Sequence, residues 1–427
     1  MNDFLKDTFN IDDRVLSLVN ACEAEISDVL GAHKAVCEHN QYKVMAALRE
    51  NRLSDTHFGW NTGYGYDDAG REVTERIFAE VLGAEAALVR TQIVNGTHAL
   101  AITLFGILRP DDELIFCTGA PYDSLMNTIG ITGEGEGSLS EFGVTYKQVE
   151  LTGTGEIDFD ALANAITDRT KVAFLQRATG YSDRPAITIE KIGQWTEFVH
   201  KLSPEIVCMV DNCYGEFIEE LEPTDAGADV MAGSLIKGIG GGIALSGGYV
   251  AGRADLIEKI AYRLTCPGIG GECGLTFGQT RNMLQGLFLA PQAVSNALKG
   301  AILCGAVFER LGFRTFPAAT DKRSDFVETV ALGEEGALLL FCEGIQAASC
   351  VDAFVKPVSA PMPGYEHDVV MAAGGFVTGS TIELSADGPL REPYNVYFQG
   401  GLTYEHAKLG IMSALQKLAD GGFIDIR

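Results

Sequence analysis

Short apolar runs alternate with helical stretches through the middle of the chain, and this alternation limits the possible folds more than any other feature. Each run is continuous and nearly free of polar residues, as strands buried on both faces of a sheet are. The runs are Ala86–Val89, Glu113–Cys117, Val172–Leu175 and Ile206–Val210, with Val230–Ala232 and Gly247–Val250 as further candidates, and the helical stretches are 97–108, 122–130, 158–167 and 188–202. The pattern predicts an α/β fold of parallel βαβ units with helices on both faces of the sheet.

The segments on either side of this region have a different pattern. Residues 11–50 repeat apolar positions at three- and four-residue steps, which predicts a helical arm. A long Ala-rich helix over 291–311 is followed by runs joined by turns and by a helix over Tyr404–Asp420. The runs expected there as strands are Phe326–Val330, Ala337–Phe341, Phe354–Pro357, Asp368–Ala372 and Ser380–Leu384. We therefore expect an N-terminal arm (1–55), a large domain (56–290) and a smaller C-terminal α+β domain (291–427).

The charge balance excludes whole classes of partner. Acidic residues outnumber basic ones by 58 to 32, which gives a net charge of −26. Nucleic acids and anionic membranes require basic patches, so neither is expected as a main partner. The sequence shows no signal peptide and no apolar run of about 18 residues, so no membrane span is expected. The ten cysteines contain no CxxC pair, and we expect a reduced, cytoplasmic protein without a metal site.

Lys237 is the first residue that suggests chemistry. It lies in the glycine-rich segment GSLIKGIGGG. A lysine there could bind a phosphate, or it could form a Schiff base with a flat cofactor that the glycines allow to approach the backbone. The Walker phosphate-binding pattern is absent, because Gly238 follows the lysine directly. A surface lysine in a flexible loop would have the same local sequence.

Three further positions lie near the ends of predicted strands. Asp211 ends the run IVCMVD, where a buried carboxylate needs a cationic partner such as a protonated pyridine nitrogen; a helix cap or a metal ligand are the alternatives. Gly96 and Thr97 open a predicted helix, whose N-terminus attracts phosphate, although such turns are also common helix caps. Tyr122 could stack on a cofactor ring or pack in the core.

The order of these groups along the chain resembles that of the aspartate-aminotransferase-like, fold-type I enzymes, which use pyridoxal 5′-phosphate (PLP). The segments VNGTHAL, QRATGYSDRP, VDNCYGEF, PGIGGECG and ELSADGPLREPY are similar to the bacterial cystathionine β-lyase/methionine γ-lyase family of aluminium-resistance-like proteins. The resemblance covers nearly the whole chain. It implies a mostly parallel seven-stranded sheet with helices on both faces, together with a smaller C-terminal α+β domain.

The resemblance also implies a role for each matching residue. Lys237 would form the Schiff base and transfer protons, Asp211 would pair with the pyridine nitrogen, and Tyr122 would stack on the ring. The residues implied in cofactor binding are Gly96, Thr97, Ser234, Lys237, Asp211, Tyr122, Tyr64, Tyr66, Arg71 and Arg177. Among them, Tyr64, Tyr66 and Arg71 lie where related enzymes reach the phosphate of a neighbouring subunit, and the spacing leaves open which of them does so. Arg391 would bind the substrate carboxylate.

The activity implied is a carbon–sulfur lyase acting on a sulfur-containing amino acid such as cystathionine, methionine or cysteine. Beta- or gamma-elimination would release a 2-oxo acid, ammonia and a thiol. The alternatives are an aminotransferase, a cysteine desulfurase using Cys266 or Cys273, or a nucleotide-binding α/β protein without catalysis. Sites shared between subunits would make the protein a homodimer or homotetramer.

Overall fold

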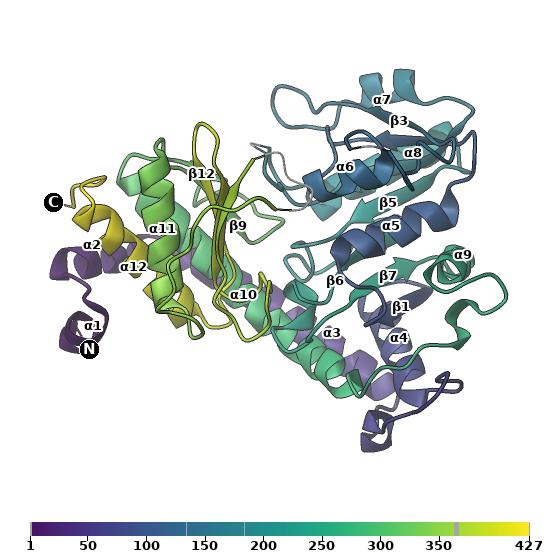
Figure 1. Ribbon diagram of the computed structural model, residues 1–427, viewed down its shortest axis with the longest axis horizontal. Coiled ribbons are helices and arrows are strands. Elements are labelled where there is room, and N and C mark those ends of the chain that lie inside the picture. Colours follow the sequence, from purple (N-terminus) through teal and green to yellow (C-terminus); the bar gives the residue numbers. More distant parts are fainter. Residues whose placement is uncertain (1, 134, 183, 363–366, 427) are drawn as a thin grey trace.

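A computed structural model describes residues 2–133, 135–182, 184–362 and 367–426, and its strands form two separate sheets (Figure 1). The larger sheet has seven strands in the order β1-β7-β6-β5-β4-β2-β3. The strands are β1 (Ala86–Arg90), β2 (Glu113–Phe116), β3 (Thr145–Gln148), β4 (Thr170–Gln176), β5 (Val207–Asp211), β6 (Val230–Ser234) and β7 (Gly248–Gly252). Strands β2 to β6 pair in parallel and β7 is antiparallel to both its neighbours. The predicted α/β fold with a mostly parallel sheet is therefore confirmed.

Helices cover both faces of this sheet because successive strand residues point to opposite sides. In β4, Ala173 and Leu175 belong to one apolar core, whereas Val172 and Phe174 belong to the other. Apolar side chains of α4, α7 and α8 pack in the first core, and those of α5, α6 and α9 pack in the second. These helices are α4 (Ala69–Val81), α5 (Gly96–Ile107), α6 (Asp123–Ile129), α7 (Phe159–Ala165), α8 (Ile189–Leu202) and α9 (Ala254–Leu264). The continuous apolar runs in the sequence arise from this double burial.

The smaller sheet is antiparallel and has the order β10-β11-β12-β9-β8. Its elements are β8 (Arg314–Phe316), β9 (Val327–Ala331), α11 (Glu335–Ala348), β10 (Val369–Ala372), β11 (Ser385–Pro389), β12 (Asn395–Gln399) and α12 (Tyr404–Asp420). Figure 1 shows this sheet and its two helices as a separate lobe, connected to the larger one by α10 (Thr280–Arg310). The expected boundary between residues 290 and 291 falls within that helix, and the three-part division of the chain stays a prediction.

Two long elements connect the lobes. Helix α3 (Ser27–Glu50) follows α1 (Asn2–Phe9) and α2 (Asp13–Glu25) and lies beside α10, where Gln41 Nε2 donates to the carbonyl of Phe288 at 3.0 Å. Among the described residues, α10 is also the helix long and apolar enough to cross a membrane by length and composition. Its apolar window is 72% buried inside the protein, as expected of a helix in the core.

Three strand predictions in the smaller lobe are wrong. Ala337–Phe341 lies inside α11, because a short apolar run cannot be distinguished by periodicity from part of a buried helix. Phe354–Pro357 forms no strand, and the Phe354 side chain is 88% exposed rather than in the core. The run Ser380–Leu384 directly precedes β11 instead of forming it.

Candidate active site

The carboxyl ends of the parallel strands bring together residues that are distant in the sequence. Strand β5 ends at Asp211, β6 ends at Ser234, and Lys237 follows three residues later. Helix α5 begins at Gly96, and Tyr122 directly precedes α6. We call Gly96, Thr97, Tyr122, Asp211, Ser234 and Lys237 the strand-end group. Open α/β sheets bind their ligands at this edge, and all six lie there because the strands between them run in parallel.

Lys237 and Asp211 form the charged centre of the group. The Lys237 ammonium lies 4.0 Å from the centre of the Tyr214 ring, a cation–π contact. Burial acts against the charged form of Lys237, but the acidic groups around it hold its pKa above the ordinary value. The Asp211 side chain is 8% exposed, and its Oδ1 accepts a hydrogen bond from the Cys213 amide at 3.1 Å. Burial raises the pKa of Asp211, while the nearby positive charge of Lys237 opposes that rise.

The N-terminus of α5 lies directly against the end of β6. A Cβ atom placed on Gly96 would be 3.3 Å from Cβ of Ser234 and 3.4 Å from Sγ of Cys213, so the glycine allows this close approach. Thr97 Oγ1 lies 2.8 Å from Oγ of Ser124, which the sequence analysis did not single out. Hydroxyls beside the backbone amides of a helix N-terminus are suited to bind a phosphate.

Tyr122 and Arg391 line one cavity of about 380 Å³. Arg391 comes from the turn between β11 and β12, so the smaller lobe contributes to this cavity. Its Nη2 donates to the carbonyl of Tyr181 at 3.4 Å. The ring of Tyr181 lies 5.9 Å from that of Tyr122. The structure therefore places the predicted carboxylate-binding arginine and the predicted stacking tyrosine in the same space.

The Arg177 backbone amide donates to the Asp211 carbonyl at 3.1 Å, but its guanidinium contacts residues outside the strand-end group. Its side chain is fully buried, and its guanidinium pairs with Glu219 at 3.3 Å and with Glu222 at 3.6 Å. Its Nη1 also donates to Asn212 Oδ1 at 2.8 Å. These contacts hold the segment after β5 against the end of β4, and a contact of Arg177 with the cofactor stays a prediction.

Arg71 and the two tyrosines before it have different environments. Arg71 is buried, and its guanidinium donates to the carbonyls of Gly65 (2.5 Å), Gly274 (3.2 Å) and Glu272 (3.2 Å). Tyr64 and Tyr66 are 75% and 60% exposed, with ring centres 5.7 Å apart. Within one chain, Arg71 therefore shapes the loop and the tyrosines project from it.

Tyr214 and Glu216 lie close to Lys237 and were not identified from the sequence. Tyr214 has a left-handed backbone (φ 70°), which is uncommon for a residue other than glycine and typical of functional sites. Glu216 is fully buried; its Oε1 accepts from the Tyr249 hydroxyl at 2.8 Å, while no partner is found for Oε2 among the described residues. A Cβ atom on Gly238 would lie 3.3 Å from that second oxygen. The only sequence signal was a glutamate within the apolar segment YGEFI.

Glu216 makes a pH-dependent prediction possible. Burial raises its pKa to about 8, so the folded protein holds a proton that the unfolded chain releases near its ordinary pKa of 4.5. Stability should therefore fall as pH rises between these values, by about 1.4 kcal/mol per pH unit for this group. Glu216→Gln removes this dependence and keeps an acceptor for Tyr249. The thermal unfolding midpoint of the variant, relative to that of the wild type, should therefore increase from about pH 5 to about pH 7.5. A constant difference across that range would contradict the assignment.

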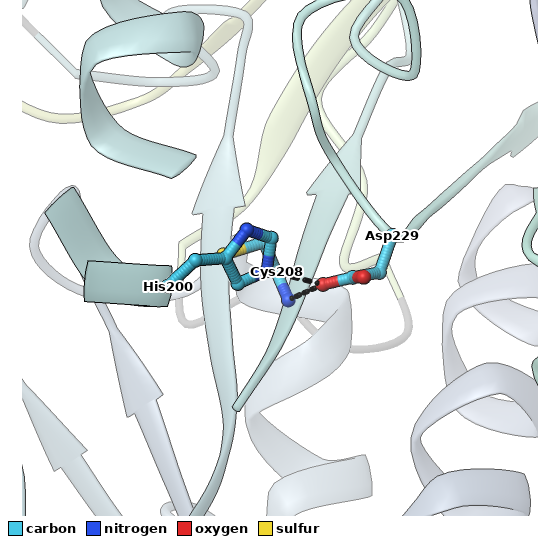
Figure 2. A group of neighbouring side chains, drawn as sticks. All are labelled: His200, Cys208 and Asp229. Carbon is cyan, nitrogen blue, oxygen red and sulfur yellow. Dashed lines mark hydrogen bonds and ion pairs between the residues drawn. The ribbon is translucent and has the colours of Figure 1, made fainter. Parts of the chain in front are cut away.

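A second polar cluster lies at the opposite end of the strands (Figure 2). The donor atoms of His200, Cys208 and Asp229 lie within 4.8 Å of one another, which is a spacing that metal ligands also have. However, Asp229 Oδ2 is already bonded to His200 Nε2 (2.9 Å) and to the Cys208 amide (2.7 Å), and Oδ1 pairs with Arg253 (3.0 Å). Burial also raises the pKa of the Cys208 thiol. The cluster connects α8, β5, β6 and α9, and we assign it a structural role.

Comparisons with known proteins cover nearly the whole chain. The family model described as methionine gamma-lyase matches residues 15–419. The uncharacterised protein YnbB of Bacillus subtilis is 50% identical over 402 residues, which are 93% of this chain and 95% of YnbB. The structure of a carbon–sulfur lyase involved in aluminium resistance from Clostridium novyi is 47% identical, with a TM-score of 0.94 and 98% of each chain covered. A Listeria monocytogenes structure, described as a candidate cystathionine beta-lyase involved in aluminium resistance, is 48% identical with a TM-score of 0.92, covering 94% of this chain and 99% of the other.

Proposed function

This chain belongs to the methionine gamma-lyase family, and we propose that it is a PLP-dependent carbon–sulfur lyase acting on a sulfur-containing amino acid by beta- or gamma-elimination. The observation that carries the proposal is the strand-end group. It combines a lysine, a buried carboxylate, an aromatic ring and a hydroxyl-bearing helix N-terminus at one edge of the sheet. Together they supply an attachment point, a partner for a ring nitrogen, a stacking surface and a phosphate site, which are the parts that PLP requires. We also propose a cytoplasmic location.

The residues present fit the cofactor. Gly96 allows the N-terminus of α5 to approach the end of β6 closely, and Thr97 and Ser234 carry hydroxyls at this junction. These three would hold the phosphate. Asp211 is a buried carboxylate in need of a cation, and it would hold the protonated ring nitrogen. Tyr122 would cover one face of the ring, and Lys237 would provide the covalent attachment.

Bound PLP supplies an electron sink for the electron pair left on Cα of the amino acid. Lys237 Nζ accepts the Cα proton, since it is the amine of the strand-end group, and it returns a proton later in the reaction. The Asp211 carboxylate would stabilise positive charge at the ring nitrogen, because burial strengthens an interaction between charges. Arg391 binds the substrate carboxylate through its two parallel N–H groups and orients the amino acid in the cavity.

The proposal is tested by measuring 2-oxo acid release from cystathionine, methionine and cysteine by the PLP-loaded protein. We expect release from at least one of the three together with equal amounts of ammonia and thiol. Formation of an amino-acid product with consumption of an added 2-oxo acid would identify an aminotransferase instead. A protein that remains colourless after addition of PLP would contradict the PLP assignment.

We further propose a homodimer or homotetramer in which Tyr64 and Tyr66 reach the phosphate of the neighbouring subunit. Both project from the surface, whereas Arg71 is bonded to the carbonyl of Gly65 in its own loop and to the carbonyls of Glu272 and Gly274. Arg71 would therefore act by shaping the loop that carries them. Two-fold symmetry is the commonest arrangement of soluble homo-oligomers and would give two equivalent shared sites.

Mixing two inactive variants should restore activity if sites are shared. Lys237→Ala chains co-refolded with Tyr64→Phe/Tyr66→Phe chains should regain about a quarter of wild-type activity, since half of the dimers are mixed and each has one complete site. The control mixes Lys237→Ala with Asp211→Asn chains. Both of those groups belong to the same chain's site, so no recovery is expected. Absence of recovery in the first mixture, with a monomeric mass by light scattering, would contradict the shared site.

A further inference from the structure

We propose that Tyr181 is a positioning residue that is held by Asp387 of the smaller lobe and fixes Arg391 for the substrate carboxylate. The inference rests on the proposed function, because it assigns Arg391 to an amino-acid substrate. It concerns the side of the cavity where the two lobes meet. Neither Tyr181 nor Asp387 was singled out in the sequence analysis.

Tyr181 makes contacts in three directions. Its hydroxyl donates to Asp387 Oδ1 at 2.7 Å, and its carbonyl accepts from Arg391 Nη2 at 3.4 Å. Its ring lies 5.9 Å from the ring of Tyr122 and 4.6 Å from that of Tyr397. Tyr181 therefore connects to the proposed stacking tyrosine and the smaller sheet through its side chain, and to the proposed carboxylate-binding arginine through its backbone carbonyl.

The environment of Asp387 favours a strong hydrogen bond to the Tyr181 hydroxyl. It lies in β11, is 5% exposed, and its second oxygen accepts from Gln399 Nε2 of β12 at 2.8 Å. Burial raises its pKa to about 6, against the effect of both hydrogen bonds and of the nearby Lys237 charge. At neutral pH the carboxylate is thus ionised, and its bond to Tyr181 is charge-assisted. A buried carboxylate is costly to desolvate, and donors on both oxygens offset that cost.

Arg391 needs such support because it is exposed and lies in a turn. A long exposed side chain loses rotamer entropy when it binds a carboxylate in one geometry. The bond from Arg391 to the Tyr181 carbonyl restricts the guanidinium before substrate arrives, which improves binding by pre-organisation. Without the bond to Asp387, Tyr181 should be held less firmly, and so should the Arg391 guanidinium that bonds its carbonyl. Ground-state binding of the substrate should therefore weaken more than turnover.

The segment around Tyr181 should remain folded without its hydroxyl. The Thr179 amide donates to Asp325 Oδ2 at 3.0 Å, and Arg184 Nη2 donates to the carbonyls of Gln176 at 2.8 Å and Ala178 at 2.5 Å. The first bond ties Thr179 to the segment before β9 in the smaller lobe, and the other two tie Arg184 to the end of β4. The residues on either side of Tyr181 therefore stay in place, while the position of Tyr181 itself depends on its own contacts. Tyr181→Phe also keeps the ring contacts, so the variant isolates the contribution of the hydroxyl.

The test compares Tyr181→Phe, Asp387→Asn and the double variant, with Tyr146→Phe as the matched control. The Tyr146 hydroxyl donates to Gln148 Oε1 at 2.6 Å in β3, and neither residue lines the cavity. We expect each single variant to raise KM about tenfold with kcat changed by less than about threefold, as for loss of one charge-assisted bond. The double variant should be no worse than either single, because both remove the same bond. The control should match the wild type.

A second readout is binding of 3-(methylthio)propionate, which has the carboxylate and thioether but no amino group and cannot react. Calorimetry should give a dissociation constant about tenfold weaker in both single variants. An unchanged KM, a fall confined to kcat, or effects that multiply in the double variant would overturn the inference. If the wild type released no 2-oxo acid, the proposed function would fail on its own, and the binding of this probe would still decide the role of Tyr181.

Discussion

Lys237→Ala is expected to lose all detectable 2-oxo acid release and the visible absorbance of bound PLP. The lysine is the amine of the strand-end group, and it would provide both the covalent attachment and the proton transfer at Cα. Its ammonium contacts the Tyr214 ring at 4.0 Å and lies within the electrostatic influence of Asp211. No neighbouring side chain of the group can replace an amine, so we expect a loss rather than a reduction of activity.

The fold of this variant should be intact, because Lys237 follows β6 and is not part of an apolar core. A thermal unfolding midpoint close to that of the wild type, measured without PLP, would establish this. The control is Lys191→Ala, which removes an ion pair with Glu156 at 2.7 Å outside the strand-end group and should leave turnover unchanged. Residual turnover in Lys237→Ala at a tenth of wild type or more would contradict the proposed role.

Asp211→Asn is expected to keep bound PLP but to lower kcat by about 10²–10³-fold, the size typical for loss of one pre-organised electrostatic group. The buried carboxylate would stabilise positive charge at the ring nitrogen, and the amide carries no charge. The substitution keeps shape and retains an acceptor for the Cys213 amide. Steady-state kinetics and absorbance spectra of the PLP-loaded protein would measure both effects.

Asp229→Asn provides a matched control for that result. Asp229 is buried to a similar degree, at 7% exposed, and lies at the other end of the same strands, where it binds His200, the Cys208 amide and Arg253. Its replacement should lower the thermal unfolding midpoint while leaving kcat close to wild type. If the two variants lost activity equally, Asp211 would be acting through stability alone.

The larger sheet was predictable because its strands are buried on both faces. Each residue of β5 and β6 is buried, so their sequences are short, mostly apolar runs, and their alternation with helical stretches marked them as strands. Strand β3 was not predicted, since TYKQ at the sheet edge is half-exposed and carries polar side chains. In the smaller lobe, the run within α11 was as apolar as a strand, and only tertiary packing distinguishes the two.

The proximity of candidate site residues could be predicted where those residues lie at the ends of neighbouring parallel strands. Asp211 and Ser234 end neighbouring parallel strands, so their proximity follows from the order of βαβ units. Arg177 also follows a strand end, but its carboxylate partners lie in a loop whose path the sequence does not reveal. The bond between Tyr181 and Asp387 joins positions in different lobes. Contacts of this kind depend on how the lobes pack, which local sequence patterns do not encode.

Identifying the lysine that carries PLP tests the central proposal most directly. The PLP-loaded protein would be reduced with borohydride, digested and analysed by mass spectrometry, with a sample lacking PLP treated in parallel. We predict that the added pyridoxyl group lies on the peptide containing Lys237 and on no other lysine. A modified lysine elsewhere, or no modification in a protein that has taken up PLP, would contradict the assignment of Lys237 and the site built around it.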